Sequence, residues 1–169
     1  ELFLYQSGYL TIKDYQMGVY ILGFPNHEVR QALYDMVLPA LTLKNNSDVQ
    51  STQSELLYAM QFGNLEDAKV ALKALISDVP YSNKKLASMD MEERYRLIIS
   101  TIFNAIGLRV EVEKMISTGR IDMVVEATNI IYVLELKLSN NGGLDAAEKQ
   151  IMTNQYTEPF KANKRQIIA

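Results

Sequence analysis

The sequence predicts an α/β (α+β) protein in which a hairpin-and-helix segment precedes an αβββαβ unit with a mixed central sheet. Three β-rich runs, at 109–116, 120–126 and 130–138, lie between helical patterns at 90–106 and 144–156. The residues Gln166-Ile167-Ile168 have the composition of a returning strand. Helices alternating with strands in this way are typical of a sheet that contains a parallel pair.

The first half of the chain has a different pattern. Two β-rich runs, 9–13 and 18–22, flank a turn around Asp14 to Met17 and predict a β-hairpin. Helices are expected after Asn26, around 55–62, and after Asn64, with both asparagines as N-caps. The polar segment 78–87, which contains Pro80, is the linker candidate and divides the chain into domains 1–79 and 80–169. A hairpin beside helices also leaves open a winged-helix-like DNA-binding unit over residues 8–80.

The composition limits what kind of site the chain can hold. The 169 residues are 48% hydrophobic and 22% charged, which is typical of a globular domain. The chain has no cysteine and one histidine, His27, so disulfides, thiolate zinc sites, cysteine nucleophiles and multi-histidine metal sites are excluded. A metal ion would therefore be held mainly by oxygen atoms, which suits Mg²⁺, Mn²⁺ or Ca²⁺.

The apolar segments and the charge distribution bear on location and partners. No apolar run reaches the roughly 18 residues of a membrane span and no secretory signal is present, so a cytoplasmic location is expected. Residues 1–79 carry 5 basic and 9 acidic side chains, and residues 80–169 carry 12 and 11, a balance that counts against strong DNA binding by this segment alone. The start without methionine and the strand-like last residues predict a fragment of a longer protein, truncated at its C-terminus.

The third predicted strand, 130–138, carries a carboxylate and an amine near its end. Side chains two positions apart share a face of a strand, so Glu135 and Lys137 follow Ile131 and Val133 on one face. The strand is otherwise apolar on both faces, as expected of a central strand covered by helices. Charged side chains in such a strand cost desolvation energy unless they are paired or bind an ion.

The preceding strand supplies a second carboxylate. If Thr128-Asn129 form a two-residue turn, the pairing register sets Asp122 opposite Glu135 on the same face. Two facing carboxylates repel unless a cation lies between them, so the pair predicts a divalent-metal site with Lys137 beside it. The alternative from the residues alone is structural, with Glu135 and Lys137 at a solvated strand end and Asp122 in a salt bridge with Lys137 or Arg120.

The motif formed by these residues resembles that of a known protein family. The segment Gly119-Arg120-Ile121-Asp122, followed by a strand ending in Glu135-Leu136-Lys137 between two helices, resembles the PD-(D/E)XK nuclease superfamily. It is most similar to the branch at the C-terminus of bacterial AAA-ATPase-like proteins. The resemblance covers about residues 90–169 and implies a restriction-endonuclease-like core. Segments 8–12 and 24–30 resemble the part that joins the two modules in that branch, which implies an ATPase-like domain in the same longer chain.

The resemblance also implies roles for individual residues. Asp122, Glu135 and the backbone carbonyl of Leu136 would bind Mg²⁺ or Mn²⁺, and Lys137 would orient the attacking water and help to deprotonate it. Glu92 matches the acidic residue that the first helix contributes in many members of the family.

Three further positions match less closely. Gln150 and Tyr156 match a glutamine and a tyrosine of the helix that follows the strands. Arg96 stands after Tyr95, where the branch often has histidine, and this departure concerns substrate handling rather than the metal centre.

Two functions follow from the resemblance. The first is Mg²⁺-dependent hydrolysis of phosphodiester bonds in nucleic acid, with DNA as the expected substrate. The second is a nuclease-like module with weak or no cleavage that serves in regulation or interaction beside an ATPase-like domain. The intact Asp122, Glu135 and Lys137 favour the first, and the acidic N-terminal half with no clear basic groove favours the second.

Overall fold

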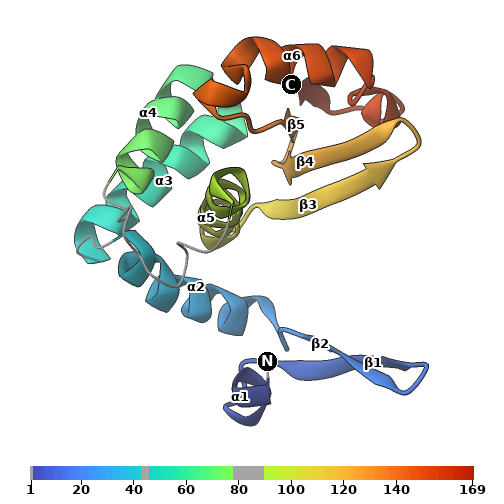
Figure 1. The fold of residues 1–169 in the computed structure, drawn as a ribbon. Coiled ribbons are helices and arrows are strands. Elements are labelled where there is room, and N and C mark those ends of the chain that lie inside the picture. Colours follow the sequence, from blue (N-terminus) through green and yellow to red (C-terminus); the bar gives the residue numbers. More distant parts are fainter. Residues whose placement is uncertain (1, 43–45, 78–89) are drawn as a thin grey trace.

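The computed structural model describes residues 2–42, 46–77 and 90–169 (Figure 1). The chain begins with a short helix, α1 (Leu2–Gln6), and an antiparallel hairpin of β1 (Thr11–Gln16) and β2 (Val19–Gly23). This small unit projects from the end of the next helix (Figure 1). The predicted hairpin is therefore confirmed.

The hairpin turn differs from the prediction. It lies at Met17 and Gly18, which have φ angles of 49° and 84°, as a two-residue turn between twisted strands requires. The predicted turn, Asp14 to Met17, is too long, because Asp14 and Gln16 belong to the first strand. Their side chains are exposed and bonded to each other, Gln16 Nε2 donating to Asp14 Oδ2 at 2.6 Å. Polar residues here mark a solvated strand face rather than a turn.

Three helices follow the hairpin: α2 (His27–Thr42), α3 (Asn46–Phe62) and α4 (Leu65–Ile76). Both predicted caps are confirmed. The side chain of Asn26 accepts a hydrogen bond from Val29 N at 2.9 Å, and that of Asn64 accepts one from Asp67 N at 3.3 Å. Each cap satisfies a backbone donor that the first turn of a helix leaves without a partner.

Helix α3 begins earlier than the predicted span of 55–62. The polar residues before that span were expected to form a connection, and they are helical instead. Val49 and Leu56 lie two turns apart on one face and are buried, with 2% and 0% exposure. Thr52 and Ser54 donate to backbone carbonyls four residues earlier, so their hydroxyl groups do not compete with the helix. Tertiary packing of Val49 outweighs the weak helix propensity of this segment.

The second half of the chain has the predicted αβββαβ order. Its elements are α5 (Met91–Ala105), β3 (Arg109–Ile116), β4 (Gly119–Glu126), β5 (Ile130–Leu134), α6 (Gly143–Thr153) and β6 (Gln166–Ile168), with short 3₁₀ turns at Ser139–Asn141 and Glu158–Phe160. The sheet order is β3-β4-β5-β6, antiparallel except for the β5–β6 pair, so the mixed sheet is confirmed. Strand β5 ends at Leu134 rather than at the predicted Leu138. The linker candidate 78–87 lies outside the described residues.

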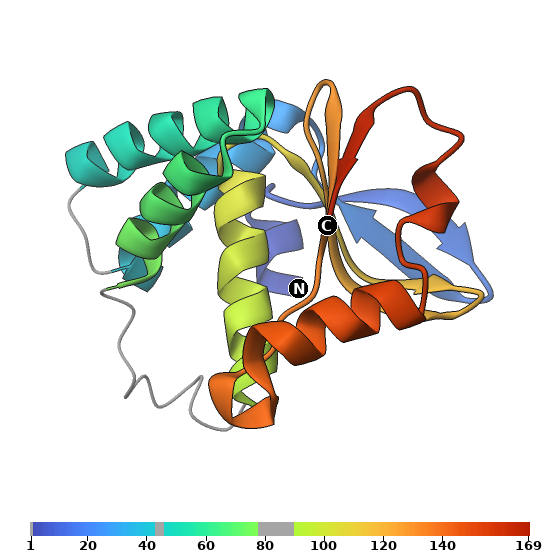
Figure 2. The same cartoon turned by 90° about the horizontal axis from the view of Figure 1, so that it is seen from above.

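The sheet has an apolar cluster on each face. The larger cluster joins α2, α3, α4 and α5 to one face of the sheet, and these helices gather on one side of it in Figure 2. The smaller cluster includes Val124, Ile131, Val133 and Tyr156 on the other face. One hydrogen bond crosses the larger cluster, from the buried hydroxyl of Tyr132 on β5 to the carbonyl of Met60 on α3, at 2.6 Å.

Candidate metal centre

Two facing carboxylates mark the end of the central strands. Strands β4 and β5 pair in the register Met123↔Leu134, and Ala127 N donates to the carbonyl of Ile130 across the predicted two-residue turn. One position beyond that last pair, the same register sets Asp122 opposite Glu135. Their side chains are 10% and 1% exposed. The predicted register of this hairpin is confirmed as far as the Met123↔Leu134 pair.

Glu135 is a buried charge with incomplete compensation. Its Oε1 lies 3.0 Å from Lys137 Nζ, but neither carboxylate oxygen has an aligned hydrogen bond in the described parts of the chain. Burial raises the pKa of Glu135 above its ordinary value and the charge of Asp122 raises it further, while Lys137 opposes both. A second cation close to such a buried carboxylate would stabilise its charged form strongly.

Lys137 lies between the acidic residues of the site. Burial by itself would lower the pKa of Lys137, but contact with Glu135 and the charges of Asp122 and Glu92 outweigh it and raise that pKa. The Lys137 side chain is 21% exposed, so part of it remains open to solvent or to a ligand. Lys137 is therefore a protonated lysine at neutral pH in this arrangement.

Glu92 reaches the same region from the first turn of α5. Its Oε1 accepts hydrogen bonds from Asn141 Nδ2 at 3.0 Å and from Leu138 N at 3.1 Å. These bonds lower the pKa of Glu92, with smaller contributions from the charges of Lys137 and Arg96. The helix start is fixed by Asp90, whose side chain accepts a hydrogen bond from the backbone N–H of Glu92 itself.

Gln150 and Tyr156 form a different contact set. Gln150 Nε2 donates to Tyr156 Oη at 3.1 Å, and Tyr156 Oη donates to the carbonyl of Arg120 at 2.8 Å. Tyr156 is buried with 1% exposure and fixes the start of β4 two residues before Asp122. The structure thus brings Glu92, Asp122, Glu135 and Lys137 together and directs Gln150 toward Tyr156.

Arg96 contacts Asp122, which the sequence did not predict. Arg96 Nη1 lies 3.3 Å from Asp122 Oδ1 and Arg96 Nη2 lies 3.0 Å from Glu113 Oε1. Arg120, the expected alternative partner of Asp122, contacts Glu113 instead, at 3.0 Å. The signal that could have indicated Arg96 is its spacing from Glu92, because residues four apart share one face of a helix.

The donor set fits a hard divalent cation. Asp122, Glu135 and the nearby Leu136 carbonyl are oxygen donors, and the two Glu135 oxygens lack the hydrogen bonds that buried carboxylate atoms normally have. Within residues 2–42, 46–77 and 90–169, no three acidic or histidine side chains gather closely enough to form a metal cluster by themselves. Mg²⁺ would thus be held by two carboxylates and a backbone oxygen, with water completing its shell.

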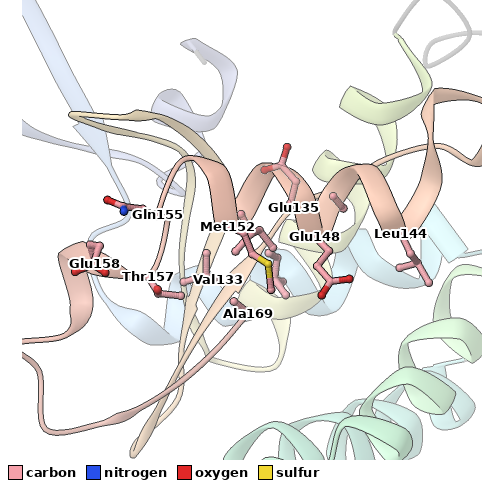
Figure 3. Close-up of a pocket in the computed structure, with 12 residues that line it drawn as sticks. Val133, Glu135, Leu144, Glu148, Met152, Gln155, Thr157, Glu158 and Ala169 are labelled. Carbon is pink, nitrogen blue, oxygen red and sulfur yellow. The ribbon is translucent and has the colours of Figure 1, made fainter.

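A pocket of about 710 Å³ lies on the α6 side of the sheet, next to Glu135 (Figure 3). Its walls are mainly apolar, with Val133, Leu144 and Met152 among them, and its charged lining residues are glutamates. In Figure 3 the carboxylates of Glu135 and Glu148 point away from each other. Because the described residues of its lining include no basic side chain, this pocket does not suit a phosphate group.

An α/β unit with a carboxylate pair and a lysine at the end of its central strands is thus established for the second half of the chain. Residues 90–169 match the family model of the PD-(D/E)XK nuclease superfamily. Over 172 aligned residues the chain is 30% identical to a protein of Azotobacter chroococcum mcd 1 named "Uncharacterized protein in vnfD 5'region". The alignment covers 96% of this chain and 32% of that relative, so the chain spans about a third of its length. No solved structure matches the chain.

Proposed function

We propose that the chain carries a Mg²⁺-dependent site that hydrolyses phosphodiester bonds of nucleic acid, with DNA as the first substrate to test. The observation that carries the proposal is the buried pair of Asp122 and Glu135 beside Lys137, in a segment that matches the family model of a nuclease superfamily. Two buried carboxylates repel each other and each loses its hydration. A divalent cation bound between them would offset both the repulsion and the lost hydration.

The proposed roles follow the contacts of each residue. Asp122, Glu135 and the Leu136 carbonyl hold Mg²⁺ or Mn²⁺, and Glu92 and Gln150 are assigned to the outer part of the site. Bound Mg²⁺ supplies positive charge against the phosphodiester and lowers the pKa of a coordinated water.

Lys137 has two ways to act. While Glu135 holds its pKa high, Lys137 is a cation that can donate to a phosphate oxygen or orient a water molecule. If a metal ion shared the negative charge of Glu135, the contribution of Glu135 that raises the pKa of Lys137 would weaken, and the lysine would be a better proton acceptor. Both roles require the ammonium group to remain near Glu135.

The second candidate is a module without cleavage that serves an ATPase-like part of a longer chain. The observation that favours it is the ion pair between Arg96 and Asp122, which gives one carboxylate a structural counter-charge. Residues 1–79 would then join the two parts, and residues 80–169 would be the nuclease-like domain. Among the described residues no helix is long and apolar enough to cross a membrane, and both candidates are proposed as cytoplasmic.

The test is cleavage of single- and double-stranded DNA and of RNA by the purified chain with Mn²⁺, Mg²⁺ or EDTA. We expect cleavage with metal, its loss in EDTA, and its loss in Lys137→Ala. Lys161→Ala removes an exposed lysine in a surface ion pair and should cut like the wild type. Metal binding with no cleavage of any substrate would reject the nuclease and favour the non-cleaving module.

A further inference from the structure

Arg96 is the feature that the proposed function does not use. Its side chain is 15% exposed and reaches from α5 to two carboxylates on two strands, Asp122 on β4 and Glu113 on β3. The two acidic residues are opposite each other in the β3–β4 register, between the pairs Val112↔Met123 and Lys114↔Ile121. One guanidinium group therefore spans the first two strands at the level of the site.

The contacts of Asp122 leave one oxygen for a metal. Asp122 Oδ2 accepts the backbone N–H of Leu136 at 3.0 Å, a bond that fixes the carboxylate to the end of β5. Within the described parts of the chain, Asp122 Oδ1 is held by Arg96 alone, at 3.3 Å. A cation that binds Asp122 and Glu135 together must compete with Arg96 for the negative charge of this carboxylate.

Glu113 is a second ion-pair partner for Arg96. The Arg96–Glu113 contact, at 3.0 Å, is shorter than the Arg96–Asp122 contact. Glu113 has a φ of 54°, a left-handed conformation that is uncommon for a residue with a side chain and that carries backbone strain. Glu113 keeps this conformation inside the continuous strand β3, opposite Asp122, and its carboxylate contacts Arg96. The guanidinium can thus release Asp122 and remain paired.

We propose that Arg96 stands in for the metal ion at Asp122 and, by competing with it, sets the divalent-cation concentration at which the site fills. This inference rests on the proposed function only in taking Asp122 and Glu135 as the metal ligands. Arg96 is a positioning residue in this account, because it acts through Asp122. Glu113 holds the guanidinium when the metal has displaced it.

The test is direct titration of the whole chain with Mn²⁺, followed by calorimetry or by the electron paramagnetic resonance of free Mn²⁺. Arg96→Met keeps the aliphatic part of the side chain and removes the competing charge. A hydrogen bond between charged groups corresponds to roughly a tenfold to hundredfold change in an equilibrium constant, so Arg96→Met should bind Mn²⁺ at least about tenfold more tightly than the wild type. Arg96→Lys, which keeps a charge but cannot span two carboxylates, should fall in between.

Arg120→Met is the matched control. This substitution also removes a guanidinium group that contacts Glu113, at 3.0 Å. Unlike Arg96, however, Arg120 has a side chain that is 52% exposed. Its effect on Mn²⁺ affinity should be less than about threefold, as expected for a screened surface charge. Unfolding curves in EDTA and in Mn²⁺ check folding, and Mn²⁺ should raise the midpoint of Arg96→Met more than that of the wild type.

The outcomes separate this inference from the proposed function. Tighter binding by Arg96→Met than by wild type and Arg120→Met supports the inference, including when wild type binds too weakly to measure. Equal or weaker binding by Arg96→Met, with measurable binding by wild type, overturns the inference and leaves the metal site standing. No binding by any folded variant overturns both. An equal gain in both arginine variants overturns the inference as well, because the effect would then be general charge.

Discussion

Replacing Lys137 by methionine tests whether the buried charge of Glu135 depends on a nearby cation. The substitution keeps the apolar part of the side chain and removes the counter-charge 3.0 Å from Oε1 of Glu135, whose side chain is 1% exposed. Breaking a buried ion pair costs about 3–5 kcal/mol because one charge is left uncompensated. Because Lys137 is about a fifth exposed and its charge is partly screened by solvent, we expect somewhat less than that range, about 2–3 kcal/mol of unfolding free energy.

The assay is urea and thermal unfolding in EDTA at neutral pH. A chain of this size loses about 2–4 °C of melting temperature per kcal/mol, so Lys137→Met should melt about 5–10 °C below the wild type. Lys161→Met is the matched control, because Lys161 pairs with Glu158 at the surface, where the two side chains are 61% and 49% exposed. It should change stability by less than about 0.5 kcal/mol.

Metal should partly repair the variant. Mn²⁺ gives Glu135 another counter-charge, so the deficit of Lys137→Met should be smaller in Mn²⁺ than in EDTA. If Lys137→Met lies within about 1 kcal/mol of the wild type in EDTA, the Glu135 charge does not need Lys137. The argument that the carboxylate pair demands a cation would then be refuted.

Two other substitutions test the support of the site. Tyr132→Phe removes the hydroxyl that donates to the Met60 carbonyl and should cost about 1–2 kcal/mol in urea unfolding, with one transition; Tyr20→Phe, at an exposed ring, should cost nothing measurable. Glu92→Gln should be less stable than wild type at neutral pH by about 1 kcal/mol. Hydrogen bonding, first from Asn141, lowers the pKa of Glu92. The stabilisation that the Glu92 carboxylate gives the folded state is therefore fully present above pH 4.5, its ordinary pKa, and is lost as the pH falls through the lowered pKa of the folded state.

Three results would contradict these two predictions. Equal stability of Tyr132→Phe and Tyr20→Phe would mean that water replaces the bond to Met60. Separate transitions in the wild type would mean that α3 and the sheet unfold independently. A deficit of Glu92→Gln that persists below the lowered pKa of Glu92 would mean that the carboxylate acts by packing rather than by charge.

The parts of the site that sequence could predict depend on local rules. Alternation along a strand and a two-residue turn were sufficient to set Asp122 opposite Glu135 and to leave Lys137 on the same side. The helix caps at Asn26 and Asn64 and the two antiparallel strand pairs of residues 109–134 follow from equally local signals. In each case the deciding residues are neighbours in the chain or across one hairpin.

The parts that sequence missed depend on packing or on unusual backbone. The contact of Arg96 with Asp122 requires the angle at which α5 crosses the sheet, which no local pattern contains. Glu113 lies in a β-rich run and gives no sign of its left-handed φ of 54°. Helix α3 starts early because Val49 finds a buried position, a tertiary effect that overrides weak local propensity. The sequence thus did not predict contacts between residues far apart in the chain. The contact of Arg96 with Asp122 is the missed contact that bears on the proposed metal site.

The early end of β5 gives the site its own spectroscopic reporters. Beyond Leu134 the chain leaves the sheet, and two of its amides are held by acidic side chains, Leu136 N by Asp122 and Leu138 N by Glu92. The exchange rate of each amide proton with solvent therefore records whether its carboxylate keeps that bond. When a ligand draws one carboxylate away, the corresponding amide should exchange faster while the other stays protected. Two leucines on either side of Lys137 would then distinguish an event at Asp122 from an event at Glu92, residue by residue and without any added label.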